Sequence, residues 1–146
     1  PPVIVERLLD SVIAKCAEEL PWRPGARELL IEARDAGIPC VLVTMSWRRL
    51  ADAVLAEAPQ GVFVGSVTGD EVANGKPAPD PYLAGALLVG VDPADCLAIE
   101  DSPTGVASAL AAGCRTVAVP HVVYVEPRAG LTMLSTLAGV HLADLV

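Results

Sequence analysis

Three short segments of the sequence combine side chains that could bind an anion or a metal ion. Thr44-Met45-Ser46 places two hydroxyls beside backbone N–H groups at a predicted helix start, where an anion can be held. Lys76 lies between a glycine and two prolines, in the segment Gly75-Lys76-Pro77-Ala78-Pro79-Asp80. Glu100-Asp101 ends an apolar run, where two neighbouring carboxylates are costly without a cation. These residue types predict a site for an anion and a divalent cation.

Each of these features alone also has an ordinary structural explanation. Thr44 and Ser46 could act only as helix N-caps, and Lys76 could be a surface lysine. Asp80 and Ser102 stand directly before prolines at predicted helix starts, so the sequence favours helix caps at both positions. A common site therefore requires a fold that brings the three segments together.

Short apolar runs that alternate with helical patterns would supply that fold. The runs at residues 38–43, 62–64, 96–99 and 116–119 predict strands buried on both faces. Helices are predicted at 24–37, 47–57, 80–89, 103–113 and 137–145, after an opening amphipathic helix that has Val5, Leu8 and Leu9 on its apolar face and ends before Pro21. This alternation predicts the α/β class, with a parallel sheet covered by helices on both faces. The carboxyl ends of parallel strands meet at one edge of the sheet, and the three segments would lie there.

The composition excludes several other classes of protein. A chain of 146 residues that is 53% hydrophobic and 19% charged is globular rather than disordered. Aromatic residues are only 3% and the net charge is -8, which argues against binding of nucleic acid. No apolar stretch reaches the roughly 20 residues of a membrane span. We therefore expect neither nucleic acid nor a membrane among the partners.

The four cysteines are far apart and form no CxxC pair. Each lies in or beside an apolar run: Cys16, Cys40, Cys96 and Cys114. This usage predicts reduced, buried cysteines in a cytoplasmic protein.

The order of the three segments resembles the haloacid dehalogenase (HAD) superfamily of phosphotransferases. Val43-Thr44-Met45-Ser46 is similar to the second motif of that superfamily, and residues 75–80 are similar to the third. Glu100-Asp101-Ser102-Pro103-Thr104-Gly105 is similar to the fourth motif. The last two motifs, with the small residues 107–113 behind them, resemble the β-phosphoglucomutase-like branch, in which a helical cap is inserted early in the chain.

The resemblance implies a role for each segment. The hydroxyl of Thr44 and the backbone N–H groups of Met45 and Ser46 would bind the phosphoryl oxygens, and Lys76 would neutralise charge between phosphoryl group and nucleophile. Thr44 and Lys76 are thus the implied catalytic residues of this chain. Asp101 would ligate Mg²⁺, with Glu100 assisting directly or through water. Fixed donors and cations suit phosphoryl transfer, which needs stabilisation of dispersed negative charge.

One motif of the superfamily has no counterpart in this chain. The first motif, Asp-x-Asp, supplies the nucleophile and the general acid/base from the central strand, and no Asp-x-Asp occurs here. The sequence also begins Pro1-Pro2 without Met, so we expect the end of a helical cap or hinge at 1–20 and an incomplete core at 21–146. The missing N-terminal segment of the same protein is the expected partner. Without the central strand, two open strand edges would flank a gap, and we expect the chain neither to fold nor to act alone.

These observations predict a Mg²⁺-dependent phosphatase that acts on a small phosphorylated metabolite through an aspartyl-phosphate on the upstream Asp. A sugar phosphomutase of the β-phosphoglucomutase type and a non-catalytic binding fragment remain as alternatives. A haloacid dehalogenase is a weaker alternative, because it needs no Mg²⁺ and leaves the Glu100-Asp101 pair unexplained.

Overall fold

The computed structural model describes residues 2–146 of the chain. The side chains of residues 1–5 and of Leu8 lie outside this description, so the predicted apolar positions Val5 and Leu8 are not placed. The opening segment is helical as predicted and forms α1 (Pro2–Glu18). No helix within the described residues is long and apolar enough to cross a lipid bilayer.

The strands form two separate parallel sheets. In the first, β1 (Val41–Val43) pairs with β2 (Gly65–Val67). The second has the order β3-β4-β5, from β3 (Leu97–Glu100), β4 (Arg115–Ala118) and β5 (Leu131–Met133). Every strand pair is parallel, which confirms the predicted α/β class.

Two helices join the sheets on one face. α4 (Asp80–Val89) contacts both β1 and β2, and α5 (Pro103–Ala112) contacts β3 and β4. The two helices also pack on each other, so they hold the sheets side by side although no ladder links β1 with β3. Both end at left-handed glycines, Gly90 and Gly113.

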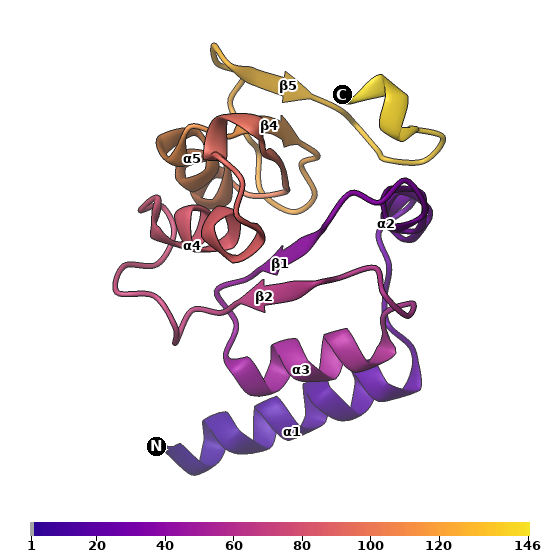
Figure 1. The fold of residues 1–146 in the computed structure, drawn as a ribbon. Coiled ribbons are helices and arrows are strands. Elements are labelled where there is room, and N and C mark those ends of the chain that lie inside the picture. Colours follow the sequence, from indigo (N-terminus) through magenta and orange to yellow (C-terminus); the bar gives the residue numbers. More distant parts are fainter. Residues whose placement is uncertain (1) are drawn as a thin grey trace.

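The opposite face of the first sheet is covered from below in Figure 1. There α3 (Arg48–Glu57) runs beside α1, and Arg49 of α3 forms an ion pair of 2.5 Å with Asp10 of α1. α2 (Ala26–Asp35) lies at the other side of the molecule, next to the C-terminal 3₁₀ turn η2 (Leu142–Asp144). A second 3₁₀ turn, η1 (Pro93–Asp95), leads into β3.

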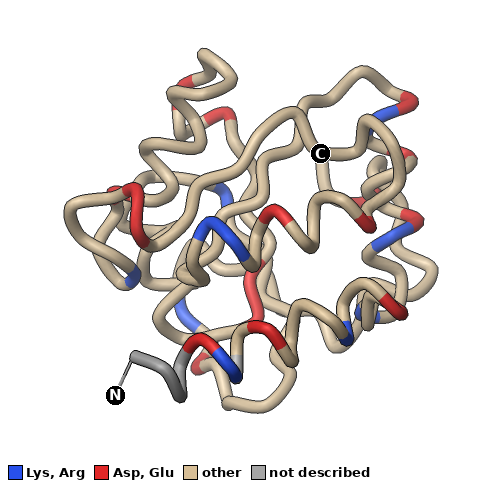
Figure 2. Tube along the Cα trace, turned by 90° about the horizontal axis from the view of Figure 1, so that it is seen from below, with Lys and Arg blue, Asp and Glu red and all other residues tan. Residues whose placement is uncertain are grey.

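The middle strand of the second sheet is buried on both faces. Val117 of β4 packs with Leu29 of α2 and with the C-terminal segment, whereas Ala118 packs with Val106 of α5. This confirms the interpretation of residue 117 and its neighbours as a doubly covered strand. Acidic residues outnumber basic residues by 18 to 10, and Figure 2 shows the two kinds interspersed along the trace.

Three predictions of local structure are wrong. The strand predicted at 62–64 lies at Gly65–Val67, because 62 still belongs to a turn after Gly61, where the N–H of Val62 bonds to Pro59. The helix predicted at 137–145 is only η2, since Gly139 takes a left-handed conformation with φ +75°. The N-cap of α4 is Pro79, so Asp80 is the first helical residue rather than the cap.

The cysteines are free thiols, but only Cys114 is buried. Burial raises the pKa of Cys114 to about 11. Cys16, Cys40 and Cys96 are partly exposed, so the expectation of four buried cysteines is wrong for three of them.

Candidate active site

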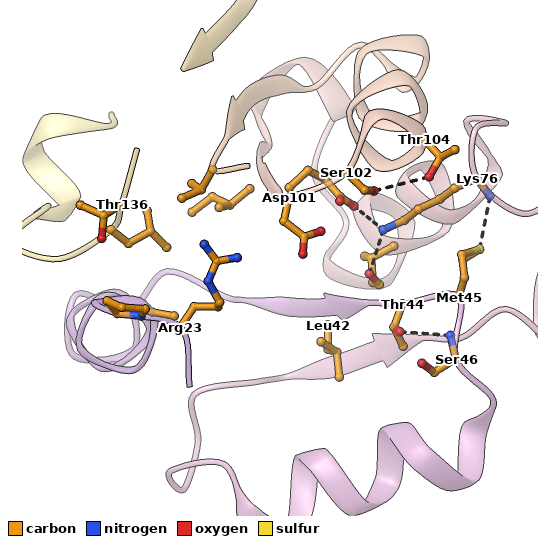
Figure 3. A pocket seen from close by; sticks show the side chains of 17 residues that line it. Arg23, Leu42, Thr44, Met45, Ser46, Lys76, Asp101, Ser102, Thr104 and Thr136 are labelled. Atoms are coloured by element: carbon orange, nitrogen blue, oxygen red, sulfur yellow. Dashed lines mark hydrogen bonds and ion pairs between the residues drawn. The ribbon is translucent and has the colours of Figure 1, made fainter. Parts of the chain in front are cut away.

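A pocket opens between the unpaired edges of β1 and β3 (Figure 3). It has a volume of about 660 Å³ and is lined by residues of both sheets. Its lining includes every site residue predicted from the sequence: Thr44, Met45, Ser46, Lys76, Glu100 and Asp101. The fold thus brings together three segments that are far apart along the chain, as the parallel topology predicts.

Thr44 opens a tight turn at the carboxyl end of β1. Its backbone N–H continues the ladder to Val67, and its hydroxyl accepts a hydrogen bond of 3.1 Å from the N–H of Ser46. Within the described residues, nothing accepts a hydrogen bond from the N–H of Met45. The turn therefore has one backbone donor without an acceptor and one hydroxyl, a combination that suits phosphate oxygens.

Gly69, in the loop after β2, packs against this turn. Its N–H donates to the carbonyl of Ser46 at 3.1 Å. A Cβ at Gly69 would lie only 2.5 Å from the carbonyl oxygen of Met45. Only glycine permits so close an approach, so the loop after β2 and the turn after β1 hold each other in place.

Lys76 reaches the pocket from the loop between β2 and α4. Its backbone N–H donates to the sulfur of Met45 at 3.2 Å, and its ammonium group donates to the carbonyl of Val43 at 3.2 Å. The ammonium also forms an ion pair with Glu100, and it lies 5.2 Å from the ring centroid of Tyr82. These contacts fix the ammonium beside the Thr44 turn, where it can neutralise the charge of a bound anion.

Glu100 is buried at the end of β3. Its Oε1 accepts hydrogen bonds from the ammonium of Lys76 and from the hydroxyl of Tyr82. Gly105 leaves the space that this carboxylate occupies, because a Cβ there would lie 1.9 Å from Oε2 of Glu100. Lys76 and Tyr82 therefore hold the buried carboxylate of Glu100, whereas the carboxylate of Asp101 is exposed.

Asp101 is exposed, and its carboxylate points into the pocket (Figure 3). Carboxylate oxygens are the ligands that Mg²⁺ prefers, and the ion usually keeps several waters with one or two carboxylates. No group of three metal-ligating side chains gathers anywhere in residues 2–146. The donors present fit part of a magnesium site: Asp101 as a free carboxylate, with Glu100 as a neighbour already engaged by Lys76.

Three further polar residues that were not predicted as site residues also line the pocket. Arg23, which precedes α2, directs its guanidinium into the pocket, and Thr136 enters from the C-terminal segment (Figure 3). Thr104 lies at the start of α5. Arg23 had one usable signal, its place before the Pro24-Gly25 helix start, whereas nothing in the local sequence marks Thr136.

Tyr82 contacts the site residue Glu100, although the local sequence does not reveal this contact. Burial and the adjacent negative charge of Glu100 raise the pKa of Tyr82 far above its usual range. The phenol is therefore protonated at all ordinary pH values and donates its hydrogen bond to Glu100. Tyr82 lies inside an apolar stretch of α4, which gives no sign of a contact with Glu100.

Carboxylates of the loop after β2 are tied to α3. Arg48 forms ion pairs with Glu71 at 2.5 Å and with Asp52 at 3.2 Å, and its backbone N–H donates to Asp70. The hydroxyl of Thr68 donates to Asp70 and, with the Arg48 contacts, lowers the pKa of that carboxyl. Hydrogen bonds from Arg48 likewise lower the pKa of Glu71. These contacts anchor the beginning of the loop that carries Lys76.

Known proteins resemble this chain over most of its length. Hexitol phosphatase A of Escherichia coli (strain K12) is 41% identical over 114 residues, which cover 76% of this chain and 51% of that protein. The crystal structure of CbbY from Rhodobacter sphaeroides in complex with phosphate has a TM-score of 0.86 and 32% identity, over 99% of this chain and 68% of that one. β-Phosphoglucomutase from Clostridium difficile shares the fold, with a TM-score of 0.71, 21% identity, and coverage of 84% of this chain and 53% of that one.

The relatives are longer than this chain. The chain spans about half the length of hexitol phosphatase A. The family model described as a haloacid dehalogenase-like hydrolase matches residues 2–113, which include all three motif segments. The chain therefore belongs to the haloacid dehalogenase-like hydrolase family, and it shares its fold with a β-phosphoglucomutase.

Proposed function

We propose that this chain provides the phosphate-binding and metal-binding side of a Mg²⁺-dependent phosphatase that acts on a small phosphorylated metabolite. The observation that carries the proposal is the convergence of the Thr44 turn, Lys76 and Asp101 on one pocket. The name of its relative, hexitol phosphatase A, supports a phosphorylated sugar or sugar alcohol as the substrate class.

Each of the six predicted site residues has a defined task in the proposal. The N–H of Met45 and the hydroxyl of Thr44 bind phosphoryl oxygens, while Ser46 keeps Thr44 in place through its own N–H. The ammonium of Lys76 stabilises the negative charge that spreads over the transferring group. Asp101 ligates Mg²⁺, and Glu100 assists through the oxygen that Lys76 and Tyr82 leave free. The ion, when bound, neutralises phosphate charge and orients the group for in-line attack.

The nucleophile comes from outside this chain in the proposal. An upstream Asp attacks phosphorus and forms an aspartyl-phosphate, while the bond to the leaving alkoxide breaks and a second upstream Asp donates its proton to that oxygen. Water then attacks phosphorus, the second Asp accepts its proton, and inorganic phosphate leaves. Both carboxylates are thereby restored, so the cycle consumes only water and the phosphate ester.

The gap between β1 and β3 is the proposed place for the segment that supplies these carboxylates. Both edges lack a ladder partner within the described residues, and the pocket between them is apolar at Leu42 and Ile99 but polar at Thr44 and Asp101. A parallel strand with apolar residues followed by Asp-x-Asp matches that gradient. We call the assembly of this chain with such a segment the completed enzyme; residues 1–20 are then the end of a cap or hinge, and 21–146 the rest of the core.

The need for this strand can be tested on the chain alone. Exposed strand edges and an unfilled gap predict no single cooperative unfolding transition and no compact monomer for the isolated 146-residue chain. A cooperative urea transition together with a monomeric compact mass would show that the gap needs no strand. The cytoplasmic location expected from the cysteines stays a prediction.

Product analysis distinguishes the phosphatase from its alternatives. The completed enzyme, given Mg²⁺ and a hexose or hexitol phosphate, should release inorganic phosphate; an isomerised sugar phosphate would instead indicate a phosphomutase. Absence of any turnover with intact substrate binding would indicate a binding fragment. Chelation by EDTA should abolish phosphate release, whereas full activity in EDTA would contradict the Mg²⁺-dependent mechanism.

A further inference from the structure

Tyr82 contacts both members of the buried Lys76–Glu100 pair. Its ring lies 5.2 Å from the ammonium of Lys76, within the distance of a cation–π contact. Its hydroxyl donates to Oε1 of Glu100, the same oxygen that accepts from Lys76. Tyr82 itself is not among the residues that line the pocket, so any influence on a bound phosphate passes through these two side chains.

The contact matters because the pair is withdrawn from water. The side chains of Lys76 and Glu100 are 10% and 7% exposed. A carboxylate in such a place needs several donors to compensate its lost hydration. Lysine is a compact charge on a flexible stem and does not fix the carboxylate by itself. The second donor comes from the helix α4, whose position is set by its packing on β1 and β2.

Other groups contact Lys76 and Glu100, but none of them supplies a further donor to the Glu100 carboxylate. Val43 accepts from the ammonium of Lys76, and Gly105 makes room for the carboxylate of Glu100. The hydroxyl of Ser108 donates to the carbonyl of Ala78, which holds the Lys76 loop against α5. None of these groups donates to Glu100, so the hydroxyl of Tyr82 is its second side-chain donor beside Lys76.

We propose that Tyr82 is a positioning residue whose hydroxyl orients Glu100 and thereby fixes the ammonium of Lys76 beside the Thr44 turn. The inference rests on the proposed function, because the position of Lys76 affects a rate only if the pocket binds a phosphoryl group. Without the hydroxyl, Glu100 keeps only the ammonium as donor, and the pair is free to rotate away from Val43.

The decisive variant is Tyr82→Phe, which keeps the ring and removes only the hydroxyl. Tyr124→Phe is the matched control, because Tyr124 is the other tyrosine of the sequence and is 75% exposed. With Mg²⁺ and an activated aryl phosphate, Tyr82→Phe in the completed enzyme should lower kcat about tenfold, the effect of losing one hydrogen bond to a charged group, and leave KM close to the parent value. A purely structural role would lower the unfolding midpoint and leave kcat of the folded enzyme unchanged, which would overturn the proposal.

A double variant tests whether Tyr82 acts through Glu100. If it does, Tyr82→Phe should cost nothing further in a Glu100→Gln background, because the interaction it supports is already lost. Losses that multiply in the double variant would mean that Tyr82 acts by another route, and the proposal would be wrong.

A measurement without turnover separates this inference from the proposed function. In the completed enzyme labelled with [¹⁵N]lysine, the ammonium resonance that disappears in Lys76→Arg belongs to Lys76. That resonance should shift or broaden in Tyr82→Phe and stay unchanged in Tyr124→Phe. An unchanged resonance in Tyr82→Phe would refute the positioning role even if phosphate is released. Conversely, if Tyr82→Phe shifts the resonance but the completed enzyme releases no phosphate, the phosphatase proposal would be wrong and the contact of Tyr82 with the Lys76–Glu100 pair would stand.

Discussion

Lys76 and Glu100 are 24 residues apart in the sequence and form an ion pair whose side chains are 10% and 7% exposed. The pair links the loop after β2 to the end of β3, across the gap between the two sheets. No ladder joins these sheets, so this contact and the packing of α4 on α5 connect them at the pocket. The pair is therefore a structural link as well as part of the proposed site.

Removing one partner of this pair should destabilise the protein strongly. Glu100→Gln leaves the ammonium of Lys76 without its counter-charge, and loss of one partner of a buried pair costs about 3–5 kcal/mol. Asp35→Asn is the control, because the Arg34–Asp35 pair is 35% and 63% exposed and exposed pairs contribute about 0–1 kcal/mol. Urea unfolding of the completed enzyme measures both, and equal effects of the two variants would contradict the account.

Gly105→Ala should disturb the Lys76–Glu100 pair by a steric clash, without a change of charge. The new Cβ would lie 1.9 Å from Oε2 and 2.1 Å from Cδ of Glu100, so the held carboxylate must move. Overpacking of this kind costs about 1–3 kcal/mol, and phosphate release should fall as well. Gly85→Ala in α4 is the control, since its Cβ would come no nearer to another side chain than 3.2 Å, from Cγ2 of Val43. Retained activity in Gly105→Ala would mean that the position of Glu100 is unimportant.

The contacts of Glu71 should give the protein an acid-sensitive component of stability. Arg48 lowers the pKa of Glu71 in the folded state below its ordinary value of 4.5. The Glu71 carboxylate therefore binds a proton more readily in the unfolded chain than in the folded protein. The stability from its contacts is present above pH 4.5 and is lost as the pH falls through the lower folded-state pKa. Urea unfolding followed between neutral and acid pH should show a shallower pH dependence for Glu71→Gln than for the parent. Glu57→Gln, at the exposed end of α3, should keep the parent dependence; identical curves for all three proteins would contradict the assignment.

The site was predictable from the sequence because its motifs are local. The Thr44 turn, Lys76 and Glu100-Asp101 each follow or lie between predicted strands, and parallel strands end at the same edge. All six predicted residues therefore line one pocket. The open edges of β1 and β3 likewise agree with the expected absence of a central strand.

The residues that the sequence did not reveal depend on tertiary contacts. Tyr82 resembles any core aromatic of a helix, and only the fold brings its hydroxyl to Glu100. Arg23 lies before α2 and enters the pocket only through the packing of that segment. Local boundaries failed for a different reason: apolar content alone does not distinguish a turn such as 61–64 from the strand that follows it.

The proposed phosphoryl transfer depends most directly on Asp101. Its carboxylate is exposed and points into the pocket (Figure 3), and it is the proposed ligand of Mg²⁺. Asp101→Asn keeps the size of the side chain and removes its charge. Asp95→Asn is the matched control, because Asp95 is an exposed carboxylate in η1, outside the pocket.

The deciding measurement is the rate of phosphate release from an activated aryl phosphate by the completed enzyme with saturating Mg²⁺. The account predicts a loss of about 100-fold or more for Asp101→Asn, the scale of removing a group that stabilises transition-state charge, and the parent rate for Asp95→Asn. A parent-like rate for Asp101→Asn would contradict the account.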